Sequence, residues 1–128
     1  MVPTIVPLYA ALITFILVIL TFRVILLRNR LKVGVGSGGH PSLERAMRAH
    51  GNFIEYVPLA LILLLLCELN GAASTTLHGL GIALILGRLA HAWGLSTSEG
   101  TSAGRAAGIV LTMLVLIGAA ARLLLHYL

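Results

Sequence analysis

The chain alternates long apolar stretches with short polar connections, and this pattern predicts four helices that cross a membrane. The apolar stretches cover roughly residues 5–27, 52–69, 75–93 and 106–125. Each is close to the ~20 residues that a helix needs to span about 30 Å of hydrocarbon. With the adjoining polar turns included, we expect spans at roughly 5–27, 48–69, 75–93 and 104–125. The expected fold is all-α, an integral membrane four-helix bundle in one domain of residues 1–128.

The first stretch is expected to remain in the mature protein as a membrane span. It lacks a basic segment at its start, is too long for the apolar core of a signal peptide, and has no small-residue cleavage pattern before Arg23. Between the first two spans, the segment from Arg28 to Leu43 is rich in glycine and serine, which predicts a flexible loop.

The composition supports a membrane protein and argues against a soluble one. Of 128 residues, 59% are hydrophobic and only 10% are charged, and the mean hydropathy is +1.03. Soluble domains carry about 25% charged residues, so this chain has too few polar groups to cover a surface in water. The lipid bilayer is therefore its expected partner, and nucleic acid is not.

The positions of the basic residues predict the orientation of the bundle. Eight of the nine flank the first and third connections, and Arg122 alone lies near the other end. Basic residues concentrate on the cytoplasmic side of membrane proteins. We therefore expect the first and third connections to be cytoplasmic and both termini to be non-cytoplasmic. The eight are Arg23, Arg28, Arg30, Lys32, Arg45, Arg48, Arg88 and Arg105.

The single cysteine, Cys67, excludes an intrachain disulfide. It lies in the leucine-rich run LILLLLCELN, where a small buried thiol is the ordinary interpretation and a reactive one the exception.

A polar stripe at the start of the second span is the main candidate for chemistry. At 100° per residue, Glu44, Arg48, Asn52 and Glu55 fall on one helix face, while His50 points nearly the opposite way. A central charge in a membrane helix costs about 2.5–3.5 kcal/mol on insertion scales, and each leucine returns only about 0.3–0.6 kcal/mol. Glu55 therefore indicates either a functional site or a salt bridge between helices.

Candidate partners for this stripe lie on the third and fourth spans. Arg88 and His91 share a face of the third span, and Arg88 is the stronger candidate to pair with Glu55 because a guanidinium can donate two hydrogen bonds to a carboxylate. His91 is then free to face a ligand. Arg105 opens the fourth span, where it either extends toward the headgroups or joins a cavity with the others.

The motifs RAMRAHGNFIEYVPL and GRLAHAWG resemble those of the membrane-associated proteins in eicosanoid and glutathione metabolism, the MAPEG family, which includes the microsomal glutathione transferases. The resemblance covers essentially the whole chain. It implies a homotrimer that binds glutathione between subunits near the cytosolic face. Carried over by position, Arg105 would act on the sulfur as the catalytic residue. The glutathione-binding residues would be Arg28, Arg48, Asn52, Glu55 and His91, with Arg88 added as the partner of Glu55.

Three positions depart from the pattern of eukaryotic members. Gly51 replaces a basic residue, and Leu95 and Ile109 replace tyrosines. These changes put the transferase rate in question more than the fold.

The expected chemistry is activation of the glutathione thiol by Arg105, followed by thiolate attack on a lipophilic electrophile or by peroxide reduction, with no metal required. Three alternatives stay open. The first is a proton-coupled transporter that uses Glu55, and the second is a non-catalytic membrane scaffold of the same fold. The third is a haem protein with His50 and His91 as ligands.

Overall fold

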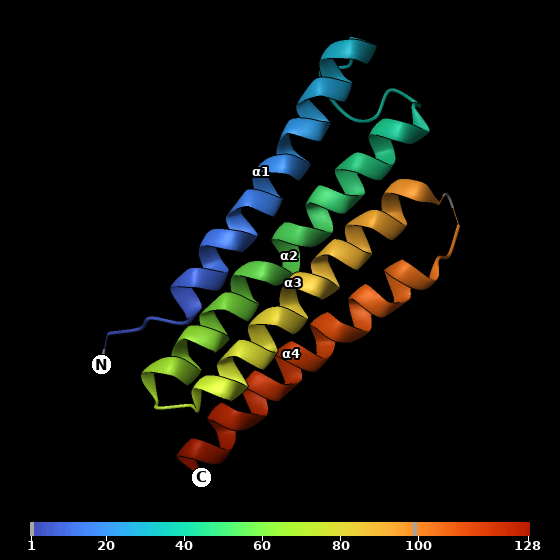
Figure 1. The fold of residues 1–128 in the computed structure, drawn as a ribbon. Helices are drawn as coiled ribbons and strands as arrows, with labels where there is room; N and C mark the ends of the chain where they lie inside the picture. The colour runs from blue at the N-terminus through green and yellow to red at the C-terminus, as the bar shows by residue number, and fades with distance from the viewer. Residues whose placement is uncertain (1, 99) are drawn as a thin grey trace.

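A computed structural model describes residues 2–98 and 100–128, and over these residues the chain is all-α. The helices lie side by side and both termini are at the same end of the bundle (Figure 1). Each helix is long and apolar enough to cross a membrane, which confirms the predicted all-α fold with four candidate spans. The helices are α1 (Val6–Leu31), α2 (Pro41–Leu69), α3 (Ser74–Thr97) and α4 (Ala103–Tyr127).

The loop between α1 and α2 is shorter than the segment from Arg28 to Leu43 that its composition predicted, because both helices extend into it. Pro41 stands at the start of α2, where its fixed φ favours a helix and its missing N–H costs nothing. Lys32 ends α1 in the left-handed conformation, with a φ of 56°. The connection is therefore confined to residues 32–40, where three of the glycines have positive φ.

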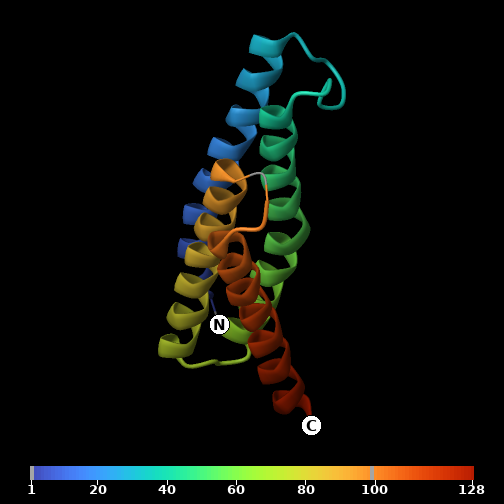
Figure 2. The ribbon, with the colours of Figure 1, turned by 90° about the vertical axis from the view of Figure 1, so that its right-hand side faces the viewer.

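Helices α3 and α4 pack against each other most extensively. Glycine makes this possible: a Cβ atom on Gly108 would lie 2.6 Å from both the Gly87 carbonyl oxygen and the His91 Cβ. Small residues permit such close approach of helices in lipid. Helix α1 packs against α2 and α3, and within the described residues it does not reach α4. In Figure 2, α1 accordingly lies on the far side of α3 from α4.

The interior and the outer surface of the bundle are both apolar. Ile13, Leu64 and Leu84 are among the buried core residues, and Cys67 is buried with them, as its setting predicted. Large side chains such as Phe15 and Ile117 are exposed. An apolar outer face agrees with lipid as the surrounding solvent.

One acidic residue that the sequence did not single out joins α2 to α1. Glu68 is only 6% exposed. Its carboxylate accepts hydrogen bonds from the backbone N–H groups of Thr4 at 2.6 Å and of Ile5 and Val6 at 2.7 Å. These groups lie at the start of α1, where N–H groups have no partner within the helix. Glu68 therefore caps α1 from a distant part of the chain.

Candidate functional site

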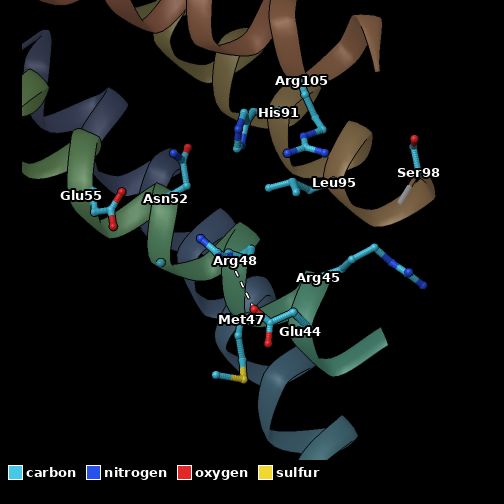
Figure 3. A pocket seen from close by; sticks show the side chains of 11 residues that line it. Glu44, Arg45, Met47, Arg48, Asn52, Glu55, His91, Leu95, Ser98 and Arg105 are labelled. Carbon is cyan, nitrogen blue, oxygen red and sulfur yellow. Dashed lines mark hydrogen bonds and ion pairs between the residues drawn. The ribbon is translucent and has the colours of Figure 1, made fainter. Parts of the chain in front are cut away.

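A cavity of about 650 Å³ opens at the end of the bundle opposite the termini, between the first half of α2, the end of α3 and the start of α4 (Figure 3). Small-molecule sites commonly measure about 300–1,000 Å³. The cavity is lined by Glu44, Arg45, Met47, Arg48, Gly51, Asn52, Glu55, His91, Leu95, Ser98 and Arg105.

Five of the residues singled out from the sequence meet in this cavity. They are Arg48, Asn52 and Glu55 from α2, His91 from α3, and Arg105 from α4. The side chains of Asn52, His91 and Arg105 point toward the same space in Figure 3. The polar stripe of α2 therefore faces the cavity.

Arg88 lies behind the cavity wall and is only 1% exposed. Its Nη1 donates to Asn52 Oδ1 at 2.8 Å, and its Nη2 donates to the Gly108 carbonyl oxygen at 3.3 Å. Its guanidinium carbon also lies 5.9 Å from the centre of the Tyr56 ring, within the range of a cation–π contact. Arg88 thus fixes the orientation of the Asn52 amide and links α2, α3 and α4.

Glu55 is exposed in the single chain and does not pair with Arg88. Among the residues that the structure describes, Glu55 has no ion pair. The pairing that the sequence favoured is therefore replaced by the contact of Arg88 with Asn52. Glu55 lines the cavity and is exposed there, so its carboxylate is available to a guest.

Arg105 occupies the first turn of α4 and is positioned by the connection before it. Its backbone N–H is capped by Ser102 Oγ at 3.3 Å, and its Nη1 donates to the Gly100 carbonyl oxygen at 2.5 Å. Its side chain points into the cavity (Figure 3). The guanidinium has five N–H donors, so this bond leaves others to face a guest.

Arg48 lies near the cavity mouth beside an acidic neighbour on the same helix. Its Nε is 3.3 Å from Glu44 Oε1, in an exposed ion pair one helical turn apart. Exposed pairs of this kind contribute at most about 0.5 kcal/mol. An anionic guest therefore competes with Glu44 for Arg48 at little cost.

Arg28 is not among the residues that line the cavity. Its Nη1 donates to the carbonyl oxygens of Val33, Gly34 and Gly36, and so shapes the connection between α1 and α2. Its Nη2 lies 3.4 Å from the Met47 sulfur, which does line the cavity. Arg28 therefore contacts a residue of the cavity wall but does not itself line the cavity.

The remaining lining residues carried weaker sequence signals. Arg45 belongs to the basic flank of the first connection, whereas Met47 and Ser98 had no signal that marks a site. Leu95 and Gly51 both line the cavity, so these two departures from the eukaryotic pattern fall on its wall. Leu95 gives the wall an apolar surface at the position where the tyrosine of eukaryotic members would offer a hydroxyl group.

The cavity offers cationic, acidic and amide groups together. The arginines can each donate hydrogen bonds to a carboxylate, the acidic residues can accept hydrogen bonds from an ammonium group, and Asn52 can hydrogen-bond to a peptide group. This donor set suits a small guest that carries charges of both signs.

Comparisons with known proteins identify the family of this chain. The MAPEG family model matches residues 6–125. Two curated relatives are each named "Inner membrane protein YecN", one from Escherichia coli K12 and one from Escherichia coli O6:H1. Each is 44% identical over 87 residues, which cover 68% of this chain and 66% of the relative. The matched region thus spans slightly less than two thirds of the relatives' length. The family match over nearly the whole chain shows that this protein is a member of the MAPEG family.

Proposed function

We propose that this protein is a membrane-bound glutathione transferase or glutathione-dependent peroxidase that binds glutathione in the cavity. The observation that carries the proposal is the meeting of Arg48, Asn52, Glu55, His91 and Arg105 from three helices around one space of about 650 Å³. Isolated polar residues in membrane helices are costly, so a convergent set of them indicates a binding site.

The chemistry of the cavity fits glutathione. This tripeptide has two carboxylates, an ammonium group, two amide groups and a thiol. Arg48 is suited to a carboxylate, Glu55 to the ammonium group, and Asn52, held by Arg88, to the peptide backbone. One carboxylate and the ammonium group of the guest thus each have a complementary side chain in the lining.

Arg105 is the residue suited to activate the sulfur. A free thiol with a pKa of about 8.5 is only a few per cent thiolate at pH 7, and the thiolate is the nucleophile. A guanidinium beside the sulfur stabilises the thiolate. In conjugation, the thiol proton passes to water, and the thiolate forms a carbon–sulfur bond to a lipophilic electrophile from the bilayer as the bond to a leaving group breaks or an electrophilic double bond opens. In peroxide reduction, two glutathione molecules supply the two electrons and become the disulfide, while the peroxide becomes an alcohol and water.

The proposal includes assembly into a homotrimer, as the family resemblance implies. Glu55 supports it, since this exposed carboxylate lies on a membrane-spanning helix and has no ion pair among residues 2–98 and 100–128. A neighbouring subunit would cover the open side of the cavity and shield this charge from lipid.

Calorimetric titration of glutathione into the detergent-solubilised protein tests the proposal. Wild type is expected to bind, at one site per chain in a complex with three times the mass of the 13.5 kDa chain. Arg48→Ala should weaken binding about tenfold or more, because a charge-assisted hydrogen bond contributes about 1.5–3 kcal/mol. Arg105→Ala should largely retain binding but lose the ultraviolet absorbance of the bound thiolate.

Arg122→Ala is the matched control, because Arg122 is exposed and does not line the cavity. It should bind glutathione and form thiolate as wild type does. Unchanged thiolate in Arg105→Ala would remove this residue from the mechanism. If wild type binds no glutathione, the proposal fails. Proton-coupled transport in liposomes that is lost in Glu55→Gln would then favour a transporter, and its absence a scaffold.

A further inference from the structure

The outer face of α1 carries a second hollow, of about 570 Å³, near the same end of the bundle. We call it the α1 groove. Its apolar walls include Val18, Ile19, Phe22 and Leu26, all of them exposed, and Arg23 and Arg30 also line it. Every lining residue is described by the structure, and none of them is acidic. The groove shares no lining residue with the cavity that is proposed to bind glutathione.

The two arginines of the α1 groove lie on one helix face. Arg23 and Arg30 are seven residues apart, which is two helical turns, with Leu26 between them. The distance along the helix axis is about 10 Å at 1.5 Å per residue. Both cations therefore adjoin the same apolar surface, at two depths.

Arg23 is held in place by a neighbouring helix. Its Nη1 donates to Ser96 Oγ on α3, and Ser96 Oγ in turn donates to the Ala92 carbonyl oxygen at 2.6 Å. A free arginine at a membrane boundary extends into the headgroup region wherever it can. The bond to Ser96 instead fixes one edge of the guanidinium and leaves its other donors available to the groove.

We propose that the α1 groove binds an anionic phospholipid, with the phosphate between Arg23 and Arg30 and an acyl chain along Phe22, Ile19 and Val18. Charge complementarity favours this occupant: two cations without an acidic neighbour in the lining attract a lipid that carries net negative charge. A zwitterionic lipid such as phosphatidylcholine also carries a quaternary ammonium group in its headgroup, and the two arginines repel this positive charge. The proposal does not depend on glutathione binding.

The length of the α1 groove agrees with one lipid leaflet. From Arg30 to Val18 the helix rises about 18 Å, and half of the hydrocarbon core measures about 15 Å. With Arg30 at the headgroups, Val18 lies close to the bilayer midplane. A phosphate held between the two arginines lies about 5 Å below Arg30, so about 13 Å of helix remains beside the acyl chain down to Val18, most of the hydrocarbon depth of one leaflet.

Native mass spectrometry of the 128-residue chain tests this proposal. The detergent-solubilised chain is titrated with phosphatidylglycerol or with phosphatidylcholine of the same acyl chains. Wild type is expected to bind phosphatidylglycerol more tightly. The variant Arg30→Gln should reduce this preference about fivefold, and the double variant with Arg23→Gln should reduce it by a further factor of about five. Raising the salt concentration should diminish the preference in wild type.

Arg122→Gln serves as the control of equal charge change, since Arg122 is exposed and outside the α1 groove. It should keep the wild-type preference. The Arg30→Gln variant is expected to fold as wild type does, because Arg30 is exposed on the bundle surface and its replacement leaves the core intact. Equal binding of both lipids by wild type would overturn the proposal. An equal loss of preference in Arg122→Gln and Arg30→Gln would also overturn it, by showing a response to net charge alone.

Discussion

The side chain of Arg88 shows how a buried positive charge is accommodated inside this bundle. Arg88 is almost fully buried, yet two of its guanidinium nitrogens bond to Asn52 and to the Gly108 carbonyl oxygen, and the Tyr56 ring lies beside it. Its Nε has no hydrogen-bond partner among the described residues. A neutral amide and a carbonyl oxygen thus hold a cation that the sequence had suggested would pair with a carboxylate.

The capping of α1 by Glu68 leads to a test by substitution. Glu68→Gln removes the charge and one of the two acceptor oxygens that serve three backbone N–H groups. We expect the free energy of unfolding to fall by about 2 kcal/mol, because hydrogen bonds to charged groups are worth about 1.5–3 kcal/mol. Hydrogen exchange at Thr4, Ile5 and Val6 should accelerate, as measured in detergent by mass spectrometry or NMR.

Glu44→Gln provides the control for this substitution. Glu44 makes an exposed ion pair with Arg48, so its change should alter stability by less than about 0.5 kcal/mol. If the amides of Thr4, Ile5 and Val6 exchange at the wild-type rate in Glu68→Gln, then the carboxylate is not what holds the start of α1.

Much of the candidate site could be predicted from the sequence because its signal is periodic. Residues four or three apart on α2 lie on one helix face, so the spacing alone groups Arg48, Asn52 and Glu55. The partners could not be assigned in this way. Whether Arg88 bonds to Asn52 or to Glu55 depends on how α3 is rotated against α2. Arg28 bonds to carbonyl oxygens of the connection between α1 and α2, and the sequence does not specify the path of that connection.

At the scale of helices, the close packing of α3 against α4 sets the position of Arg105 relative to His91. Gly94 and Gly108 lie where this interface is tightest, since a Cβ atom at Gly94 would come within 2.6 Å of the Arg105 backbone nitrogen. The two helices therefore bring one side of the cavity together through backbone contact. Larger residues here would separate the helices and move both functional side chains.

Gly108→Ala should consequently destabilise the protein. Its Cβ would lie 2.6 Å from atoms of Gly87 and His91, so the helices must shift, and overpacking of this kind typically costs about 1–3 kcal/mol. The loss would appear as a lower midpoint in thermal or denaturant unfolding in detergent. Glutathione affinity should fall with it.

Gly118→Ala is the matched substitution on the same helix. Its nearest neighbour across the interface would be Leu80 Cδ2 at 3.6 Å, an ordinary contact, so the alanine should leave stability unchanged or raise it by up to about 1 kcal/mol. Equal effects of the two alanine substitutions would contradict the tight interface at Gly108.

The helices themselves could be predicted from hydropathy, while their ends could not. A long apolar run has few alternatives in a membrane, so all four helices were recognised. The start of α2 at Pro41 lies in a polar segment that hydropathy does not distinguish from a loop. Capping by Glu68 is also invisible to local patterns, because the carboxylate and the N–H groups that it accepts are more than 60 residues apart.

At the scale of the whole molecule, both termini lie at one end of the bundle (Figure 1), and the residues that line the cavity lie near the other end. The basic residues near the cavity end predict that this end faces the cytoplasm, where glutathione is available to a binding site. The orientation therefore bears directly on the proposed function.

Reporter fusions test the orientation. Alkaline phosphatase fused after Leu128 should be active and green fluorescent protein at the same place should be dark, because the C-terminus is expected on the non-cytoplasmic side. Fusions after Gly36, in the connection between α1 and α2, should give the reverse pattern and serve as the internal control. A fluorescent C-terminal fusion would contradict this orientation and place the cavity on the opposite side of the membrane.

The position of Arg105 in the first turn of α4 has a consequence for the energetics of an anionic guest. The first turn of a helix carries a partial positive charge from its aligned peptide dipoles, and this turn contains no acidic residue to balance it. A cation in such a turn costs about 0.3–1 kcal/mol. A thiolate bound here would neutralise the guanidinium and the helix end together, so that α4 is most stable when the anion is in place.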